Sequence, residues 1–133
     1  MDAVLDCPSA ETTEVKPEGF PKMNPAVKEM WVTALRSGKY KQGRDMLNAC
    51  NEMCCLGVLC DIYDPSGWIG DPDSECYSFL YSPNIGKSVD IYPPLEVLDW
   101  ASLSNDVQLH LAELNDNRGL TFNQIADWIE ANL

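Results

Sequence analysis

The sequence predicts a single small α+β domain in which N- and C-terminal helices pack on a small antiparallel sheet. Its length of 133 residues is enough for one domain with a sizeable core. Apolar residues recur with helical periodicity after residue 25 and again near the C-terminus, which predicts helices at both ends. Between them, residues 54–60 (CCLGVLC) form the densest apolar run, and we interpret this run as the buried centre of the domain.

Residues 1–24 are expected to form a flexible acidic arm, and residues 25–133 to form the domain. The arm is rich in proline, threonine and glutamate and poor in large apolar residues. Such a composition buries too little surface to order a chain. Val15 and Phe20 are the candidates for local contacts between this arm and the domain.

The first helix is predicted to begin at Asn24-Pro25, with asparagine as the N-cap and proline at the first helical position. An amphipathic stripe follows, and Ser37-Gly38 ends the helix. Residues 42–55 are predicted to form a β-hairpin with a turn at residues 48–51. The apolar run after it fits either a buried strand or a helix. We favour a strand that enters a short helix ending before residue 64.

The second half of the chain alternates between turns, short strands and helices. Residues 64–75 are rich in turn residues and acids, which predicts a surface loop. Strands are predicted over residues 76–81 and 89–92, followed by short helices over 95–101 and 107–114. Thr121 is expected to cap a last helix, with Gln124 at the capping-box position. The predicted core comprises Trp31, Leu35, Cys55, Leu56, Leu59, Phe79, Leu98, Ile125 and Ile129.

Charge is distributed unevenly along the chain, whose net charge is −12. Residues 25–44 carry +4, whereas residues 45–133 carry −13. Acidity on this scale repels nucleic-acid phosphates and is compatible with either a solvated surface or a basic partner. The sequence contains no apolar run long enough to span a membrane and no recognisable secretory signal. We therefore expect a cytoplasmic protein with reduced cysteines and no membrane association.

Four blocks of sequence stand out: Trp31-x-x-Ala34-Leu35-Arg36-Ser37-Gly38-x-Tyr40-x-Gln42-Gly43, Cys54-Cys55-Leu56-Gly57-Val58-Leu59-Cys60-Asp61, Leu114-Asn115-Asp116 and Phe122-x-x-Ile125-Ala126-Asp127-x-Ile129-Glu130. In these blocks the chain resembles a family of small uncharacterised proteins from bacteriophages and prophages, over residues 28–132. The resemblance implies a phage-encoded accessory protein that works in the cytoplasm of an infected bacterium. It implies no activity and no residue roles.

The basic segment after the first helix is the best candidate for ligand binding. Its arginines and lysines supply charge for a phosphate or an acidic partner, and its glycines let backbone N–H groups approach an anion closely. It contains neither a Walker motif nor a dinucleotide-binding motif. The competing interpretation, which we slightly favour, is that these residues form salt bridges with the chain's surplus carboxylates. The candidates are Arg36, Lys39, Tyr40, Lys41, Gln42 and Arg44.

Cysteine and histidine chemistry gives weaker candidates. Four cysteines are an alternative zinc site, but their spacing matches no usual zinc knuckle, and we favour packing in the core. A cysteine beside His110 would make a nucleophile and base, but a lone histidine in an apolar helical stretch is usually structural. The zinc alternative comprises Cys50, Cys54, Cys60 and Cys76.

Two further motifs are disfavoured. Residues 71–75 are acidic but lack the central glycine and the closing glutamate of an EF-hand calcium loop. The C-terminal helices are similar to the first two helices of a helix-turn-helix, but residues 120–133 contain no lysine or arginine. A recognition helix needs such cations, so sequence-specific DNA binding is not expected.

We expect a non-enzymatic accessory protein that binds and inhibits a host protein, such as a defence component. This hypothesis depends on the family resemblance, the small size, the acidic surface and the lack of a catalytic motif. Two alternatives stay open. One is a protein that binds and sequesters a phosphorylated or nucleotide small molecule through the basic segment, and the other is a virion structural or decoration protein. No cofactor is expected, and the oligomeric state is left open.

Overall fold

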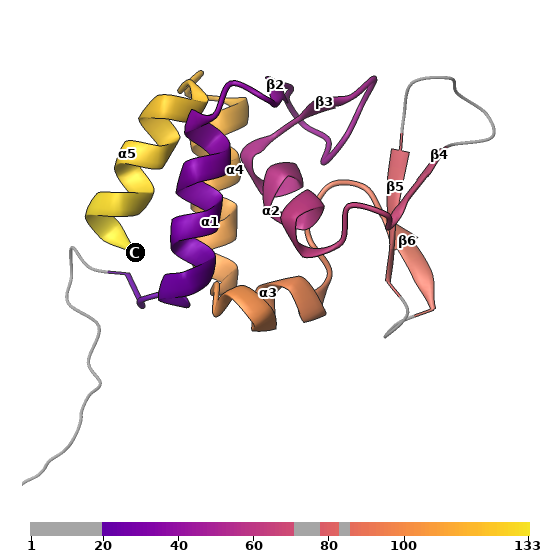
Figure 1. Ribbon diagram of the computed structural model, residues 1–133, viewed down its shortest axis with the longest axis horizontal. Coiled ribbons are helices and arrows are strands. Elements are labelled where there is room, and N and C mark those ends of the chain that lie inside the picture. The colour runs from indigo at the N-terminus through magenta and orange to yellow at the C-terminus, as the bar shows by residue number, and fades with distance from the viewer. Residues whose placement is uncertain (1–19, 71–77, 83–85) are drawn as a thin grey trace, which may run out of the picture.

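The computed structural model describes residues 20–70, 78–82 and 86–133. Within these ranges the helices form one body, and a small sheet stands beside it (Figure 1). None of the described helices is long and apolar enough to cross a membrane. The elements are α1 (Pro25–Arg36), β2 (Lys41–Gln42), β3 (Glu52–Met53), α2 (Cys55–Tyr63), β4 (Trp68–Gly70), β5 (Ser78–Ser82), β6 (Lys87–Val89), α3 (Leu95–Ala101), α4 (Asn105–Asp116) and α5 (Phe122–Asn132).

Local capping sets the start of α1 and of α5, as predicted. The Asn24 side chain accepts hydrogen bonds from two backbone N–H groups of the first turn of α1, at 3.0 and 3.4 Å. Pro25 is the first helical residue. Thr121 and Gln124 form a reciprocal capping box at the start of α5. These bonds satisfy backbone donors that have no partner inside a helix.

The chain ahead of α1 contributes to the core. Met23 is buried, and Phe20 packs its ring against His110 of α4 and Trp128 of α5, at centroid distances of 5.5 and 5.2 Å. The backbone N–H of Asn24 donates to the carbonyl oxygen of Ala101 at 2.9 Å, which ties the start of α1 to the end of α3. Residues expected in the arm thus pack against the helices.

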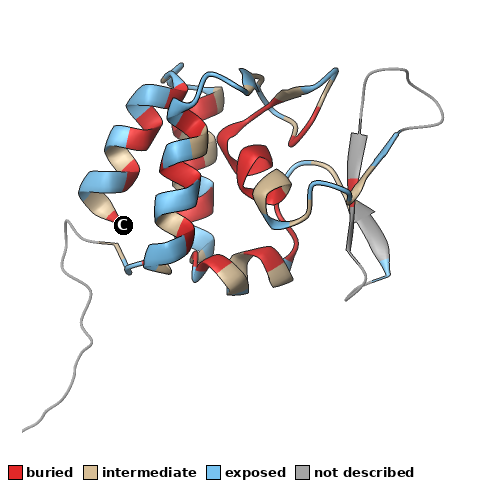
Figure 2. Ribbon diagram, viewed as in Figure 1, coloured by how far each residue is buried: buried red, intermediate tan, exposed pale blue. Residues whose placement is uncertain are grey.

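The helix α2 lies between the other helices and the small sheet β4–β5–β6 (Figures 1 and 2). Every residue from Cys55 to Cys60 is buried, so α2 is apolar around its circumference. A helix of this kind is stable only when neighbours cover it on several sides. Accordingly α1, α3 and α4 all contact α2, and α1 and α4 also contact α5.

The predicted class, a small domain of mixed helices and strands, is confirmed. The expectation that the terminal helices pack on a sheet is wrong, because these helices pack on one another and around α2. The predicted helix ending before residue 64 is confirmed, since α2 ends at Tyr63. The strand expected to lead into it covers only Glu52–Met53.

A tight turn precedes β3. Ala49 and Glu52 exchange two backbone hydrogen bonds, both 2.9 Å long. Between them, Cys50 and Asn51 have φ angles of 57° and 64°. Two central residues with positive φ define the type I′ turn that usually joins antiparallel strands.

The predicted hairpin over residues 42–55 is nevertheless wrong in its pairing. β2 and β3 are parallel, with Lys41 opposite Glu52 and Gln42 opposite Met53. The chain before the turn does not continue the ladder because Leu47 is buried and its backbone N–H donates to the carbonyl oxygen of Asp90 at 2.8 Å. Apart from the pair Ala49–Glu52, β3 therefore pairs with β2, which lies earlier in the chain.

The separate sheet β4–β5–β6 is antiparallel. Trp68 lies opposite Leu80, and Leu80 lies opposite Val89, so these three residues share one face. Leu80 is buried and the other two pack against the core, which turns this face toward the helices. The strand predicted over 76–81 occurs as β5, over residues 78–82 of the described chain. The strand predicted over 89–92 is wrong apart from Val89, because β6 ends at that residue.

The predicted core is largely confirmed. Leu98 is only partly buried, and the side chain of Phe79 lies outside the described part of the structure. Trp31 donates its indole N–H to the carbonyl oxygen of Cys55 at 2.9 Å, which satisfies the one polar atom of that buried ring. The buried members are Trp31, Leu35, Cys55, Leu56, Leu59, Ile125 and Ile129.

Candidate functional site

Most of the basic segment is used to hold the fold together. Arg36 forms ion pairs with Asp127 and Glu130 of α5, each with an N–O distance of 2.7 Å. The hydrogen bonds that Arg36 donates to these carboxylates raise its pKa above the ordinary value. Lys41 pairs with Glu52 at 3.2 Å, across the two strands β2 and β3. Both Arg36 and Lys41 therefore form salt bridges with carboxylates of the same chain, as the competing interpretation predicts.

Tyr40 and Asp61 join the basic segment to α2. The Tyr40 hydroxyl donates to Asp61 Oδ2 at 2.6 Å, and the Trp68 indole N–H donates to Asp61 Oδ1 at 2.9 Å. Burial, followed by the hydrogen bond to the Asp61 carboxylate, raises the pKa of Tyr40 to about 12. The neutral phenol is thus part of the folded structure.

This geometry predicts an alkaline loss of stability that depends on Tyr40. Because the pKa of Tyr40 is raised from its ordinary value of 10.0, the folded state holds the phenolic proton more tightly than the unfolded state. Its contribution is complete below that ordinary value and is lost as pH rises to about 12. Below pH 10.0, urea unfolding should show that wild type is more stable than Tyr40→Phe. This difference should disappear once the pH has passed the raised pKa of about 12.

Tyr63→Phe is the matched control, since the structure describes no hydrogen bond of the Tyr63 hydroxyl. Its effect on the free energy of unfolding should be small, because the substitution removes no described hydrogen bond. A difference between wild type and Tyr40→Phe that stays constant up to the raised pKa would contradict the assignment.

A buried asparagine connects three of the four blocks that carry the family resemblance. Asn115 is fully buried, and its Oδ1 accepts from Gln42 Nε2 at 2.9 Å and from the backbone N–H of Cys55 at 3.2 Å. Its Nδ2 donates to the carbonyl oxygen of Gly43 at 2.9 Å and to Asp116 Oδ1 at 2.8 Å. The motif residues thus meet in one structural network, which we call the Asn115 network.

Two cations of the basic segment have no ion-pair partner among the described residues. Lys39 and Arg44 are exposed and form no ion pair with the residues that the structure describes. The Gln42 side chain already donates to Asn115 Oδ1 at 2.9 Å and to the carbonyl oxygen of Leu120 at 2.8 Å. The six candidate ligand residues therefore do not converge on one site.

The described cysteines divide into two classes. Cys54, Cys55 and Cys60 are free and buried, whereas Cys50 is disulfide-bonded. The expectation of reduced thiols is therefore wrong for Cys50. Burial raises the pKa of Cys54 to about 11 and raises those of Cys55 and Cys60 well above the usual range. Cys76, the remaining member of the zinc alternative, lies outside the described residues.

We predict that these three buried thiols resist alkylation in the folded protein. A thiol reacts as its thiolate, and burial both hides the sulfur and disfavours that ion. Iodoacetamide at mildly alkaline pH should leave Cys54, Cys55 and Cys60 unmodified, as read by peptide mass spectrometry. The same treatment in urea should modify all three. Rapid labelling of Cys55 in the folded protein would contradict the central position of α2.

The other proposed chemistry finds little support in the geometry. His110 lies in an aromatic cluster, with its ring 4.9 Å from that of Trp128 and 5.5 Å from that of Phe20. Among the described residues there is no group of three or more His, Cys, Asp or Glu side chains placed to hold a metal. The acidic residues 71–75 lie outside the described part of the chain.

The approach to α3 forms an exposed apolar segment that the sequence analysis missed. Ile91, Tyr92 and Leu95 are 49%, 41% and 66% exposed, while Pro93 and Pro94 between them are buried. We call these five residues the Ile91–Leu95 segment. Ile91 and Tyr92 were predicted to lie in a strand, although the two prolines directly after them indicated that no strand could continue.

The prolines make the Ile91–Leu95 segment rigid. Each fixes its own φ angle, and each also restricts the residue before it. The preceding residue, Asp90, is anchored by the hydrogen bond from the backbone N–H of Leu47. Large apolar side chains are thus displayed to solvent on a backbone with little freedom, which lowers the entropy cost of binding.

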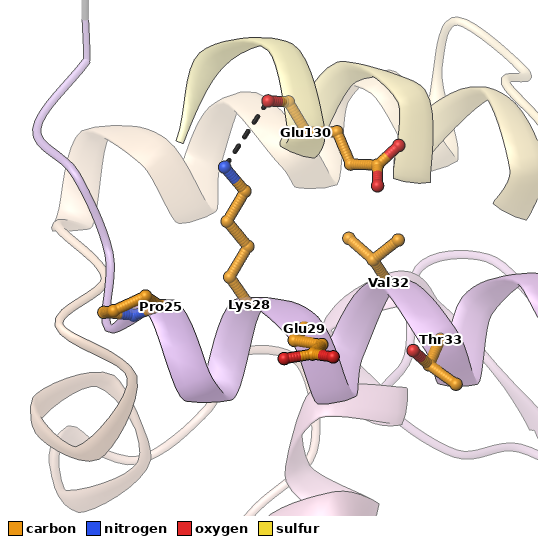
Figure 3. Close-up of a pocket in the computed structure, with 6 residues that line it drawn as sticks. All are labelled: Pro25, Lys28, Glu29, Val32, Thr33 and Glu130. Atoms are coloured by element: carbon orange, nitrogen blue, oxygen red, sulfur yellow. Dashed lines mark hydrogen bonds between the residues drawn. The ribbon is translucent and has the colours of Figure 1, made fainter.

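Two grooves flank the exposed ridge of α1. The groove between α1 and α5 has a volume of about 350 Å³ and is lined largely by polar and charged residues (Figure 3). Lys28 reaches across it and donates to the backbone carbonyl oxygen of Glu130 at 3.4 Å (Figure 3). A cation is favourable at the C-terminal end of a helix, so this lysine helps to join the two helices.

The second groove lies between α1 and α2 and has a volume of about 530 Å³. Its surface is mostly apolar, with Met30, Ala34 and Ile62 among the lining residues. Met30 is 45% exposed. Glu29 and Lys39 are the charged residues that line it.

Comparison with known proteins places most of the chain in a protein family. Residues 23–133 match the family model described as a domain of unknown function (DUF8296). Neither the curated proteins nor the solved structures contain a significant match. The matched range includes every described helix and strand, and with them the Asn115 network, the Ile91–Leu95 segment and both grooves.

Proposed function

We propose that this chain, which belongs to the family of the domain of unknown function DUF8296, is a non-enzymatic phage accessory protein that binds and inhibits a host protein. The phage origin and the cytoplasm of an infected bacterium as the place of action come from the sequence resemblance. A component of host defence is one class of target that such a protein would have. The Ile91–Leu95 segment is the observation that carries the binding function.

This segment has the properties of a protein-docking surface. Single exposed apolar residues are common, but three large ones within five residues are not. Ile91, Tyr92 and Leu95 offer apolar area on a rigid backbone, and a tyrosine is a frequent anchor at interfaces. The exposed carboxylate of Asp99 lies one helical turn beyond Leu95.

The charge of the chain favours a basic partner surface. Residues 45–133, which include the segment, carry a net charge of −13. Fields of this kind steer an oppositely charged protein toward its docking site and speed association more than they strengthen the final complex. The partner should therefore present an apolar pocket with lysine or arginine at its edge, and association should slow as salt is added.

Capture of host proteins with matched variants tests this proposal. Leu95 is the first residue of α3, where an acidic side chain suits the helix dipole, so Leu95→Glu should fold normally. Leu109→Glu is the control, because Leu109 is 44% exposed but lies on α4. Wild type and Leu109→Glu should capture the same host protein from lysate, and Leu95→Glu should lose it. The captured protein, once purified, should lose activity when wild type is added.

Two results would count against this proposal. One is equal capture of every host protein by wild type and by Leu95→Glu. The other is a captured protein whose activity is unchanged by saturating amounts of the wild-type chain. Circular dichroism of each variant separates loss of binding from loss of the fold.

A second candidate is binding of a phosphorylated or nucleotide small molecule. It is supported by a hollow of about 250 Å³ that Arg36, Tyr40 and Gln42 share with the first residues of α5, whose helix N-terminus favours anions. These three side chains already have partners, so a ligand would have to compete with them. Native mass spectrometry of the protein purified from bacteria should show an added mass the size of a nucleotide, and a bare polypeptide mass would argue against this candidate.

A further inference from the structure

The groove between α1 and α2 has one charged residue at each end and apolar residues between them. Glu29 lies near the start of α1, and Lys39 lies three residues beyond its end. A helix rises about 1.5 Å per residue, which separates the two groups by more than about 10 Å along the groove. Met30, Ala34 and Ile62 line the groove between them.

Neither charge is used within the described part of the chain. Glu29 and Lys39 are both exposed, and the structure describes no ion pair of either side chain. Met30, directly beside Glu29, exposes nearly half of its surface. The apolar surface continues to Tyr63, which follows Ile62, is 40% exposed and lies edge-on to Trp100 with ring centroids 5.1 Å apart.

Such a surface is complementary to itself. A two-fold axis through the middle of the groove would run the two α1 helices in opposite directions and exchange the ends of the groove. Glu29 of each copy would then face Lys39 of the other, and the apolar centres would lie against each other. Every contact in an interface of this type occurs twice.

We propose that two copies of this chain associate through their α1–α2 grooves about a two-fold axis. Met30 of each copy enters the apolar groove of the other, next to Ile62. Two Glu29–Lys39 ion pairs close the ends and fix the antiparallel direction of the two α1 helices. The proposed dimer uses a different surface from the Ile91–Leu95 segment. The dimer and the binding of a host protein can therefore be tested independently, and either proposal can be wrong without the other.

Charge exchange tests the interface specifically. Glu29→Lys would place two lysines at each end, and Lys39→Glu would place two glutamates there. Each single variant should raise the dimer dissociation constant by about tenfold or more, because two attractive pairs become two repulsive ones. The double variant Glu29→Lys/Lys39→Glu restores opposite charges at both ends. Its dissociation constant should return close to that of wild type.

Sedimentation velocity over a range from micromolar to submillimolar protein measures these constants. Met30→Glu should leave a monomer, whereas Leu109→Glu, at an equally exposed position on α4, should dimerise like wild type. A wild-type protein that stays monomeric throughout would overturn the proposal. So would a double variant that associates no better than the single variants, because that result would place any dimer interface elsewhere. Circular dichroism confirms that each variant is folded.

Discussion

Replacement of Asn115 by alanine is expected to lower the free energy of unfolding by about 3 kcal/mol or more. The side chain is fully buried and makes four hydrogen bonds of 2.8–3.2 Å. Alanine would leave the buried backbone N–H of Cys55 and the partly buried carbonyl oxygen of Gly43 without these partners. Each buried group without a partner costs about 1–3 kcal/mol. The measurement is urea unfolding followed by circular dichroism.

Asn117→Ala is the matched control for this prediction. Asn117 follows the last residue of α4 and is exposed, and its side chain donates to Glu113 Oε1 at 2.7 Å. Its loss should change the free energy of unfolding by less than about 0.5 kcal/mol. Equal effects of the two substitutions would mean that the Asn115 network does not hold β2, α2 and α4 together.

The helix ends could be predicted because their causes are local. Asn24 bonds to N–H groups two and three residues away, and the capping box of Thr121 and Gln124 spans three positions. Helical periodicity in the same way identified most of the core, including Trp31 and Ile125. In each case the residues that form the sequence pattern lie within one or two turns of a helix.

The strand pairing and the site could not be predicted because they depend on contacts between distant residues. The turn at residues 49–52 is typical of a hairpin, but the burial of Leu47 ends that ladder and β3 pairs with β2 instead. The partners of Arg36 lie 91 and 94 positions away along the chain. Asn115 was predicted to end a helix, and no local pattern marks it as the centre of a network.

A methyl group added at Gly57 is expected to disrupt the domain. Local propensity predicts the opposite, since alanine is preferred over glycine in a helix interior by about 1 kcal/mol. However, a Cβ atom at Gly57 would lie 1.9 Å from the carbonyl oxygen of Leu47 and 2.8 Å from its carbonyl carbon. These are backbone atoms, and Leu47 is held on its other side by the hydrogen bond to Asp90. Gly57→Ala should therefore destabilise the fold by about 3 kcal/mol or more.

Gly70→Ala distinguishes this steric effect from a general effect of replacing glycine. A Cβ atom at Gly70 meets none of the described residues within 4 Å. The free energy of unfolding of Gly70→Ala in urea should therefore lie within about 0.5 kcal/mol of the wild-type value. If Gly57→Ala were as stable as wild type, α2 could not lie against the Leu47 backbone. The buried cysteines and the α1–α2 groove both depend on this position of α2, and both assignments would have to be revised. A large loss at Gly57 with none at Gly70 would place this glycine among the residues that fix α2 in the centre of the fold.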